Sequence, residues 1–239
     1  MKRLLLALLL ATSCTSSRTS EIPESEAMTL AEFGGPLFLS LPSRRSDDIV
    51  LSFGDCERLR TQVAVEVENR PPSTAIYGGL STTTTSGGHS ESSCTSPTFA
   101  WAASLWPTGA STFSVTDHSA SWHLTVDLTG LADRRLVLDP TPDVVRAGDA
   151  VTVRLTPAPV GVVLSHVGAS FTSGGVTTKV SALATGATLQ LAIPATAPGP
   201  ATLTVEADAE YSVAACGVPG GCQIAHPVLT RATIPLVIE

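Results

Sequence analysis

Residues 187–207 read ATLQLAIPATAPGPATLTVEA, and this stretch carries the pattern that decides the fold. Large apolar residues alternate with smaller or polar ones over 189–193 and again over 203–206. A period of two places alternate side chains on one face of a β-strand. The segment Pro194 to Pro200 between the two runs cannot join a strand ladder, because proline has no N–H to donate. The stretch therefore predicts a strand, a corner, and a returning strand with its apolar side chains on the same inner face.

The same period recurs along the whole chain. It is present over residues 49–53, 63–68, 122–128 and 151–155, with Gly, Pro or Asp between the runs at intervals of about ten residues. Beyond the N-terminal leader, no window of a dozen residues shows a comparable helical period. Short alternating strands with such punctuation are typical of antiparallel sandwiches. We therefore expect an all-β protein of two antiparallel β-sandwich domains.

Composition and net charge indicate which classes of macromolecule the protein can bind. The 239-residue chain is 43% hydrophobic and only 15% charged, with 14 basic and 21 acidic residues and a formal net charge of −7. Without Lys2 and Arg3, which belong to the leader, 12 basic residues face 21 acidic ones, a difference of −9. An acidic surface without a basic cluster repels phosphate backbones. A nucleic-acid partner is excluded.

The N-terminus has the pattern of an export signal. Lys2 and Arg3 are followed by an apolar run over residues 4–11, then by Thr12, Ser13 and Cys14. Eight apolar residues are far short of the roughly 20 that a membrane-spanning helix needs. A basic start, a short apolar run and a small-residue approach are typical of a cleaved signal peptide.

Residues 11–14, Ala-Thr-Ser-Cys, resemble a bacterial lipoprotein lipobox, although Ala11 stands where Leu is usual. The resemblance implies cleavage before Cys14 and lipidation of its thiol. It gives a signal peptide over 1–13 and a lipid-anchored flexible tether over 14–29, and it places the protein in the cell envelope, at the outer membrane or cell surface. The alternative is ordinary secretion with cleavage after Ser13, which would leave Cys14 free or in a disulfide.

Four cysteines remain besides Cys14, namely Cys56, Cys94, Cys216 and Cys222. An even number in an exported chain indicates disulfides, and three connectivities exist. We favour Cys56 with Cys94 and Cys216 with Cys222, because this pairing keeps each bond within one domain. A zinc site is disfavoured because the CGVPGGC run has five residues between its cysteines, where zinc ligand pairs have two to four.

Two prolines at Pro140 and Pro142 suggest that residues 139–143 are a stiff connector. This boundary gives one sandwich domain over 30–138 and a second over 144–239. All three tryptophans precede the boundary. Within the first domain, the Ser/Thr/Gly-rich run over 81–96 has few apolar groups to bury, and we expect a long loop there.

The second half resembles a known family. Residues 148–153 are similar to the start of the B strand of bacterial immunoglobulin-like domains, and residues 187–207 resemble the E strand, Pro-rich turn and F strand of the TIG-type subgroup. The resemblance covers about residues 141–239 and implies an immunoglobulin-like β-sandwich. The insertion between Cys216 and Cys222 departs from the family's short F–G hairpin.

No catalytic residue, cofactor or metal ligand is predicted. The chain has no Gly-x-Ser-x-Gly turn and no His-Glu-x-x-His motif. Asp117 and His118 are neighbours, so on a strand they would point to opposite faces, as would His118 and His123. Three acidic residues near the connector, Asp139, Asp143 and Asp149, lack the spacing of a known calcium loop, so we interpret them as solvated.

Of the tryptophans, Trp101 and Trp122 share the inner face with neighbouring apolar residues and are predicted to lie in a core. Trp106 breaks the alternation and precedes Pro107. It is the one candidate ligand-binding residue, since an exposed indole can stack on a sugar ring.

The expected function is that of a non-enzymatic, lipid-anchored cell-envelope protein that acts in surface adhesion, scaffolding or binding. Its partners would be the membrane, through the lipid, and a protein or glycan at the cell surface. Two alternatives remain open: a carbohydrate-binding or carbohydrate-active accessory protein, and a subunit of a secretion or surface assembly.

Overall fold

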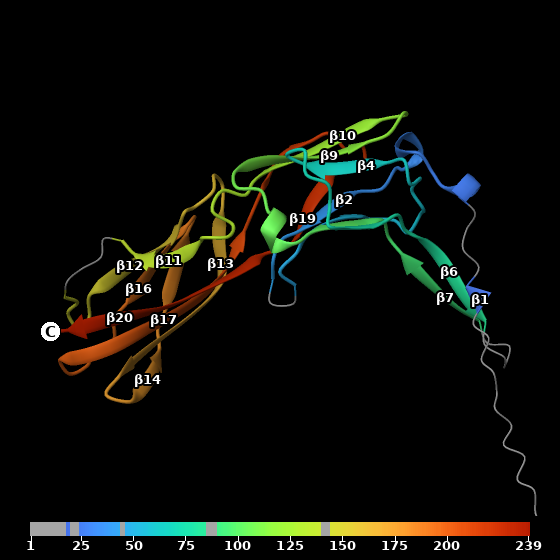
Figure 1. Cartoon of the computed structure of the whole chain (residues 1–239). Helices are drawn as coiled ribbons and strands as arrows, with labels where there is room; N and C mark the ends of the chain where they lie inside the picture. Colours follow the sequence, from blue (N-terminus) through green and yellow to red (C-terminus); the bar gives the residue numbers. More distant parts are fainter. Residues whose placement is uncertain (1–17, 20–23, 44–45, 85–89, 140–143) are drawn as a thin grey trace, which may run out of the picture.

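The computed structural model describes residues 18–19, 24–43, 46–84, 90–139 and 144–239. The protein is nearly all β, as predicted, and consists of two sandwich modules arranged end to end (Figure 1). The expected signal peptide, Cys14 and residues 15–17 and 20–23 of the expected tether lie outside the described residues. The end of the expected tether is not free: Ala27 is buried, and Met28 forms a parallel bridge with Leu59. No helix in the described part of the chain is both long enough and apolar enough to span a membrane.

The second module is built from two four-stranded sheets. One sheet has the order β11 (Arg135–Leu138), β12 (Ala150–Thr156), β16 (Thr188–Ala192), β15 (Ala182–Thr185). The other has the order β14 (Val176–Lys179), β13 (Val163–Ser173), β17 (Gly199–Glu210), β20 (Val228–Ile238). Taken along the chain, these are the A-B-E-D and C′-C-F-G orders of an immunoglobulin sandwich. The finer TIG-type assignment stays a prediction.

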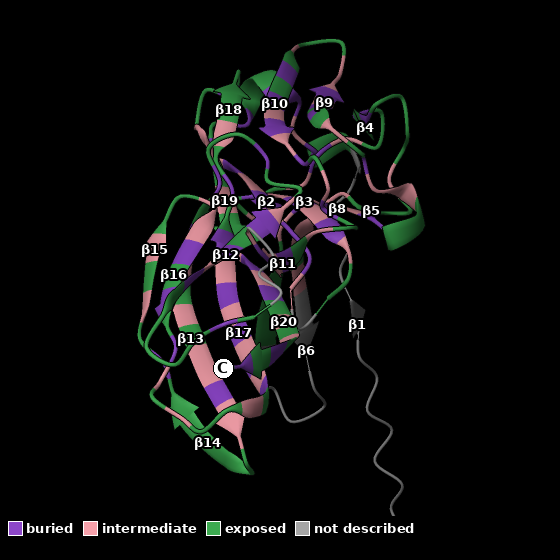
Figure 2. Ribbon diagram, turned by 90° about the vertical axis from the view of Figure 1, so that its left-hand side faces the viewer, coloured by how far each residue is buried: buried purple, intermediate pink, exposed green. Residues whose placement is uncertain are grey.

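The predicted alternation fills the core of this module. Leu189 and Leu191 of β16 and Leu203 and Val205 of β17 are buried, and the residues between them are more exposed. Figure 2 shows this alternation along the strands of both modules. Residues 194–198 form no strand, so the quoted stretch folds as a strand, a corner and a strand that crosses to the other sheet.

The first module also consists of two packed sheets. The five-stranded sheet has the order β19 (Cys222–His226), β2 (Leu37–Ser40), β3 (Ile49–Phe53), β8 (Thr98–Trp101), β5 (Thr74–Ile76). The four-stranded sheet has the order β18 (Val213–Cys216), β10 (Ser121–Asp127), β9 (Ala110–Thr116), β4 (Ala64–Val67). Three short 3₁₀ helices, η1 (Glu24–Glu26), η2 (Leu30–Glu32) and η3 (Ala103–Leu105), accompany these strands.

Aromatic side chains form the centre of the first module's core. Phe33 and Phe53 meet edge to face with ring centroids 4.9 Å apart, and Trp101 meets Phe113 at 5.3 Å. Trp101 is fully buried and Trp122 is 4% exposed, so the prediction that both face inward is confirmed. The Trp101 Nε1–H donates to the Arg70 carbonyl oxygen, which satisfies its buried polar atom.

The sheets do not divide the chain at residues 139–143, where the sequence placed the boundary. Strand β11, assigned to the first domain, pairs with β12 of the second module over Leu136↔Leu155. The chain then crosses to the other sheet, where Val145 bridges Ile238 in parallel. Strand β11 and the segment around Val145 therefore belong to the second module, where each lies at the edge of one sheet. Residues 140–143 lie outside the described residues.

A second difference concerns β18 and β19, which come from the second half of the chain but complete the sheets of the first module. Strand β18 pairs antiparallel with β10, and β19 pairs parallel with β2. These two strands and their connection occupy the place of the F–G hairpin; we call residues 213–226 the excursion. The excursion covers one edge of each first-module sheet, and uncovered edges invite non-native strand pairing.

Close backbone contacts fix the tip of the excursion. The Gly217 N–H donates to the His123 carbonyl oxygen at 2.8 Å, and the Leu37 N–H donates to the Gly221 carbonyl oxygen at 2.9 Å. A Cβ added at Gly220 would lie 2.2 Å from the Gly35 carbonyl oxygen, so only glycine allows this approach. The Cys216–Cys222 disulfide closes the same tip.

The prediction of a long loop over residues 81–96 is wrong. Strands β6 (Gly79–Thr84) and β7 (Ser90–Thr95) pair antiparallel, and β1 (Arg18–Thr19) pairs with β6. The run is poor in apolar residues, but threonine favours extended backbone and the ladder satisfies the backbone polar groups. The Cys56–Cys94 disulfide attaches β7 to the chain that follows β3.

We predict that the excursion stabilises the first module more than the second. Replacing residues 213–226 with a short Gly/Ser turn should increase amide hydrogen exchange in β2 and β10, because each loses a ladder neighbour, while β12 and β16 stay protected. Hydrogen–deuterium exchange with mass spectrometry measures this.

The matched control is the double variant Cys216→Ser, Cys222→Ser, which keeps both strands. It should lose about 2 kcal/mol of unfolding free energy, the chain-entropy value for a loop this short. Equal exchange increases in both modules of the turn variant would contradict the assignment of the excursion to the first module.

Candidate functional site

The structure forms both predicted disulfides. Cys56 is bonded to Cys94 and Cys216 to Cys222, with Cα–Cα distances of 5.5 and 5.8 Å. Disulfides persist in oxidising compartments. The two bonds therefore indicate a protein that folds outside the cytoplasm.

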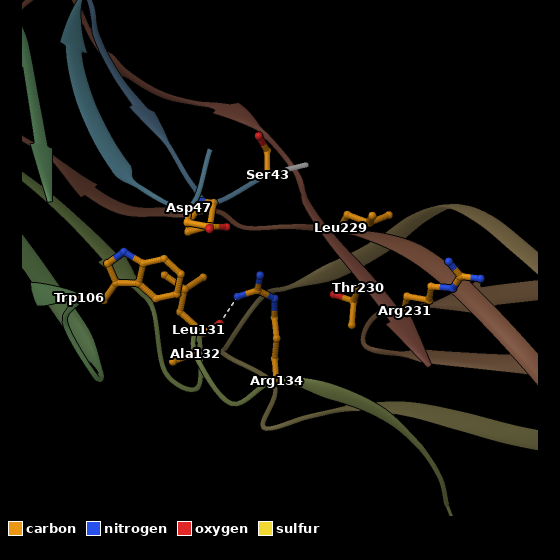
Figure 3. A pocket seen from close by; sticks show the side chains of 10 residues that line it. Ser43, Asp47, Trp106, Leu131, Ala132, Arg134, Leu229, Thr230 and Arg231 are labelled. Atoms are coloured by element: carbon orange, nitrogen blue, oxygen red, sulfur yellow. Dashed lines mark hydrogen bonds between the residues drawn. The ribbon is translucent and has the colours of Figure 1, made fainter. Parts of the chain in front are cut away.

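Trp106 lies at a pocket between the two modules. The pocket has a volume of about 320 Å³ and is open to solvent. Its walls include Pro42, Asp47 and Trp106 of the first module and Leu131, Arg134 and Thr230 of the second. Figure 3 shows these side chains around a common space, which we call the junction pocket. Its volume is at the low end of ligand pockets, about 300–1,000 Å³.

Local structure holds Trp106 in place. Its backbone N–H donates to the Ala103 carbonyl oxygen at the end of η3, and its carbonyl oxygen accepts from Arg70 at 3.3 Å. The side chain is half-buried against the core. In Figure 3 the six-membered ring of the indole is turned toward Leu131 and Arg134, and Nε1 lies on the remote side. The pocket therefore meets the apolar part of the ring.

Two arginines line the pocket: Arg231 is paired with Glu206 at 3.3 Å, whereas Arg134 has no carboxylate partner among the described residues. Arg134 stands directly before β11, and its Nη1–H donates to the Leu131 carbonyl oxygen (Figure 3). Burial lowers the pKa of the Arg134 guanidinium, and the neighbouring Tyr211 partly offsets this. Burial likewise raises the pKa of the Tyr211 hydroxyl, with Arg134 acting in the opposite direction. The guanidinium and the hydroxyl lie close enough for a side-chain hydrogen bond to contribute to both pKa shifts, although Arg134 Nε and Tyr211 Oη have no partner of ideal geometry.

No carboxylate of the described residues forms an ion pair with Arg134. The ion pairs there join Arg154 to Asp139, His166 to Asp208 and Arg231 to Glu206. Asp47 lines the same pocket but is outside ion-pair distance of the guanidinium. Withdrawing a charge from water without a counter-charge costs free energy. Arg134 is therefore a half-buried cation that its own surroundings do not neutralise.

The junction also gathers the unsatisfied buried polar atoms of the described residues. These atoms are Trp106 Nε1, Arg134 Nε, Tyr211 Oη and Thr230 Oγ1. Three of the four residues line the junction pocket, and the fourth neighbours Arg134. Each buried polar atom without a partner costs about 1–3 kcal/mol. Such costs concentrate where function, and not stability, shapes the structure.

Sequence reasoning found Trp106 but missed Arg134 and Thr230. The walls come from residues 42–47, 106, 131–134 and 229–231, which are far apart in the chain. Arg134 follows a turn and Thr230 occupies an inward position of β20, a site that usually holds an apolar residue. A threonine at an inward strand position is a weak signal that sequence alone could have offered.

Asp117 and His118 do not act together. The Asp117 carboxylate accepts hydrogen bonds from the N–H of Leu30, from the N–H and hydroxyl of Ser119 and from the N–H of Ala120. Burial alone would raise its pKa, but the hydrogen bonds dominate and lower the pKa to about 2. The carboxylate thus ties the β9–β10 turn to η2.

The acidic residues near the expected connector are also engaged. Asp139 forms an ion pair with Arg154 at 2.9 Å, Asp149 accepts from the Arg146 N–H, and Asp143 lies outside the described residues. Within the described ranges, no group of three or more His, Cys, Asp or Glu residues is arranged to hold a metal ion.

A wider pocket of about 620 Å³ adjoins the junction pocket through Ser43 and Leu229. Asp48, Asp208 and His226 contribute its charged and titratable groups. The Asp208 carboxylate is already paired with His166, 3.5 Å away. This pocket lacks the unsatisfied polar atoms that mark its neighbour.

Comparison with known proteins identifies no family. No protein-family model matches the sequence, and no curated protein matches it. Among solved structures, the chain is similar to the "D0-D1 domain of Intimin" with 13% sequence identity and a TM-score of 0.21; the match covers 84% of this chain and 96% of that one.

We predict that Thr230→Val stabilises the protein. The substitution removes a buried hydroxyl without a hydrogen-bond partner and keeps the side-chain shape, so the free energy of unfolding should rise by about 1 kcal/mol. Denaturant unfolding measures the change. Thr188→Val is the control, because the Thr188 hydroxyl donates to the Thr185 carbonyl oxygen at 2.8 Å, and its loss should give no gain. A destabilised Thr230→Val protein would show that the hydroxyl has a structural role.

Proposed function

We propose that this chain is an exported, non-enzymatic binding protein, held at the cell envelope by lipidated Cys14, whose ligand site is the junction pocket. The observation that carries the proposal is the gathering, in one pocket between the modules, of an aromatic ring, a guanidinium without a carboxylate partner among the described residues, and the buried hydroxyl of Thr230. Arg134 Nε and Thr230 Oγ1 are buried atoms of wall residues without a hydrogen-bond partner, and such atoms are uncommon unless a function uses them.

The architecture supports a rigid site. The walls of the junction pocket come from both modules, and the excursion fixes one module to the other by pairing β18 with β10 and β19 with β2. The Asp127 carboxylate at the end of β10 adds a further link by accepting from the Val160 N–H at 3.0 Å. A preorganised pocket binds more tightly, because less conformational freedom is lost on binding.

The nature of the walls favours binding over catalysis. Among the described residues that line the pocket, Asp47 is the single carboxylate, and the neighbouring Asp48 lines the adjoining pocket instead, whereas glycoside hydrolysis uses two carboxylates in one site. An apolar ring face and a cation at the ends of one small pocket are suited to holding a ligand. This arrangement favours the carbohydrate-binding version of the function over a purely structural role.

We expect lipid to be attached at Cys14. Cys14→Ala should move the protein from the membrane fraction to the soluble fraction, because a cleaved lipoprotein signal without its thiol leaves no anchor. Fractionation followed by intact-mass measurement of the mature chain tests this, with Thr15→Ala as a control that keeps the anchor. A mature chain with an unmodified Cys14 thiol would contradict the anchor.

We expect Trp106 to contact the ligand. On a polysaccharide column that retains the parent protein, Trp106→Ala should bind at least about tenfold more weakly, as is typical for loss of a central aromatic contact. Trp106→Phe keeps an aromatic face and should retain most of the binding. Unchanged retention of Trp106→Ala would remove the junction pocket from the proposal, and a protein partner found by co-purification from detergent-solubilised envelopes would favour the assembly alternative.

A further inference from the structure

We propose that the junction pocket recognises an acidic sugar, a pyranose that carries a carboxylate, with the carboxylate bound by Arg134 and the ring against Trp106. This inference rests on the proposed function, because it names the ligand class of the same site. It starts from the charge of Arg134, which the described residues leave unpaired.

A carboxylate suits the free side of Arg134. The guanidinium is a planar fork of five N–H donors; Nη1 donates to the Leu131 carbonyl oxygen, and the neutral hydroxyl of Tyr211 lies beside the group without supplying a counter-charge. The hydrogen bond to Leu131 holds the fork in one orientation, with its tip toward the pocket (Figure 3). An ordered guanidinium can bind a carboxylate through two parallel hydrogen bonds, and the partly desolvated setting strengthens them.

The opposite walls suit a sugar ring. The indole of Trp106 presents its six-membered ring to the same space, and the apolar face of a pyranose packs well on such a surface (Figure 3). Asp47 lines the pocket as well and can accept hydrogen bonds from ring hydroxyls. A simple inorganic anion would leave Trp106 without a partner and would offer Asp47 no hydroxyl donors. A ligand with both a carboxylate and hydroxyls uses all three walls.

The size of the pocket limits the ligand to about one ring. Its volume of about 320 Å³ matches the smallest of typical ligand sites. Leu131 and Pro42 close the space with apolar surface. We therefore expect recognition of a single acidic residue, either terminal or within a chain that leaves through the open side.

The test compares acidic glycans with their own neutral forms. Oligosaccharides that contain uronic or sialic acid are each tested beside the carboxyl-reduced product, in which the carboxylate has become a primary alcohol. We expect the acidic member of at least one pair to bind the full-length mature protein ten- to a hundredfold more tightly by calorimetry. We also expect added salt to reduce this preference.

Variants then assign the preference to Arg134. Arg134→Gln should bind the acidic and reduced forms alike, and Arg134→Lys should keep part of the preference because it keeps the charge without the fork. Arg154→Gln is the control, since Arg154 pairs with Asp139 and does not line the pocket. A melting curve for each variant shows whether it folds, and the comparison of acidic with reduced glycans on the parent protein needs no variant.

The outcomes separate the two levels of the proposal. Equal binding of acidic and reduced forms, with both lost in Trp106→Ala, would overturn the acidic-sugar inference and leave the glycan-binding function standing. No binding of any member of the panel would overturn both. Preferential binding of a peptide C-terminal carboxylate, tested with a short peptide and its amide, would overturn the sugar assignment and retain Arg134 as an anion site.

Discussion

The structure depends on the backbone hydrogen bonds that join β18 to β10 and β19 to β2. These ladders carry a segment of the second module into both sheets of the first, so neither first-module sheet is complete without residues from the far half of the chain. The Cys216–Cys222 disulfide and the close approach of Gly220 to Gly35 hold the segment in register. The connection between β17 and β20 of the second module thus supplies an edge strand to each sheet of the first module.

This exchange explains why the pocket exists at the boundary of two modules. Strand β20 returns from the excursion and brings Thr230 beside Arg134, which stands at the start of the second module. The facing wall, with Trp106 and Asp47, belongs to the first module. If flexible linkers alone joined the modules, the walls would move relative to each other, and domain boundaries of that kind do not preorganise a small ligand. The strand exchange thus makes a shared binding site physically reasonable.

The junction pocket and the first module's core differ in how far their buried polar groups are paired. Arg134 is half-buried without a carboxylate partner, and the hydroxyl of Thr230 is buried without a hydrogen bond. In the centre of the first core, by contrast, the Nε1 of Trp101 has a backbone acceptor and aromatic rings meet edge to face. The core satisfies its polar groups internally, whereas the junction leaves several of them without a hydrogen-bond partner.

The sequence alone determined the all-β class, the inward rows such as Leu189, Leu191, Leu203 and Val205, the burial of Trp101 and Trp122, and the expectation that the four described cysteines form disulfides. These features follow from local period and counting, because burial on one face of a strand requires alternation. Only the tertiary structure decided that β11 belongs with β12, that β6 pairs with β7, and which of the possible disulfides form. It also decided that Arg134 and Thr230 share a pocket with Trp106. Strand partners are chosen by backbone hydrogen bonds, which any residue except proline can make, so mostly exposed strands such as β18 and β19 carry no sequence pattern that names their neighbours.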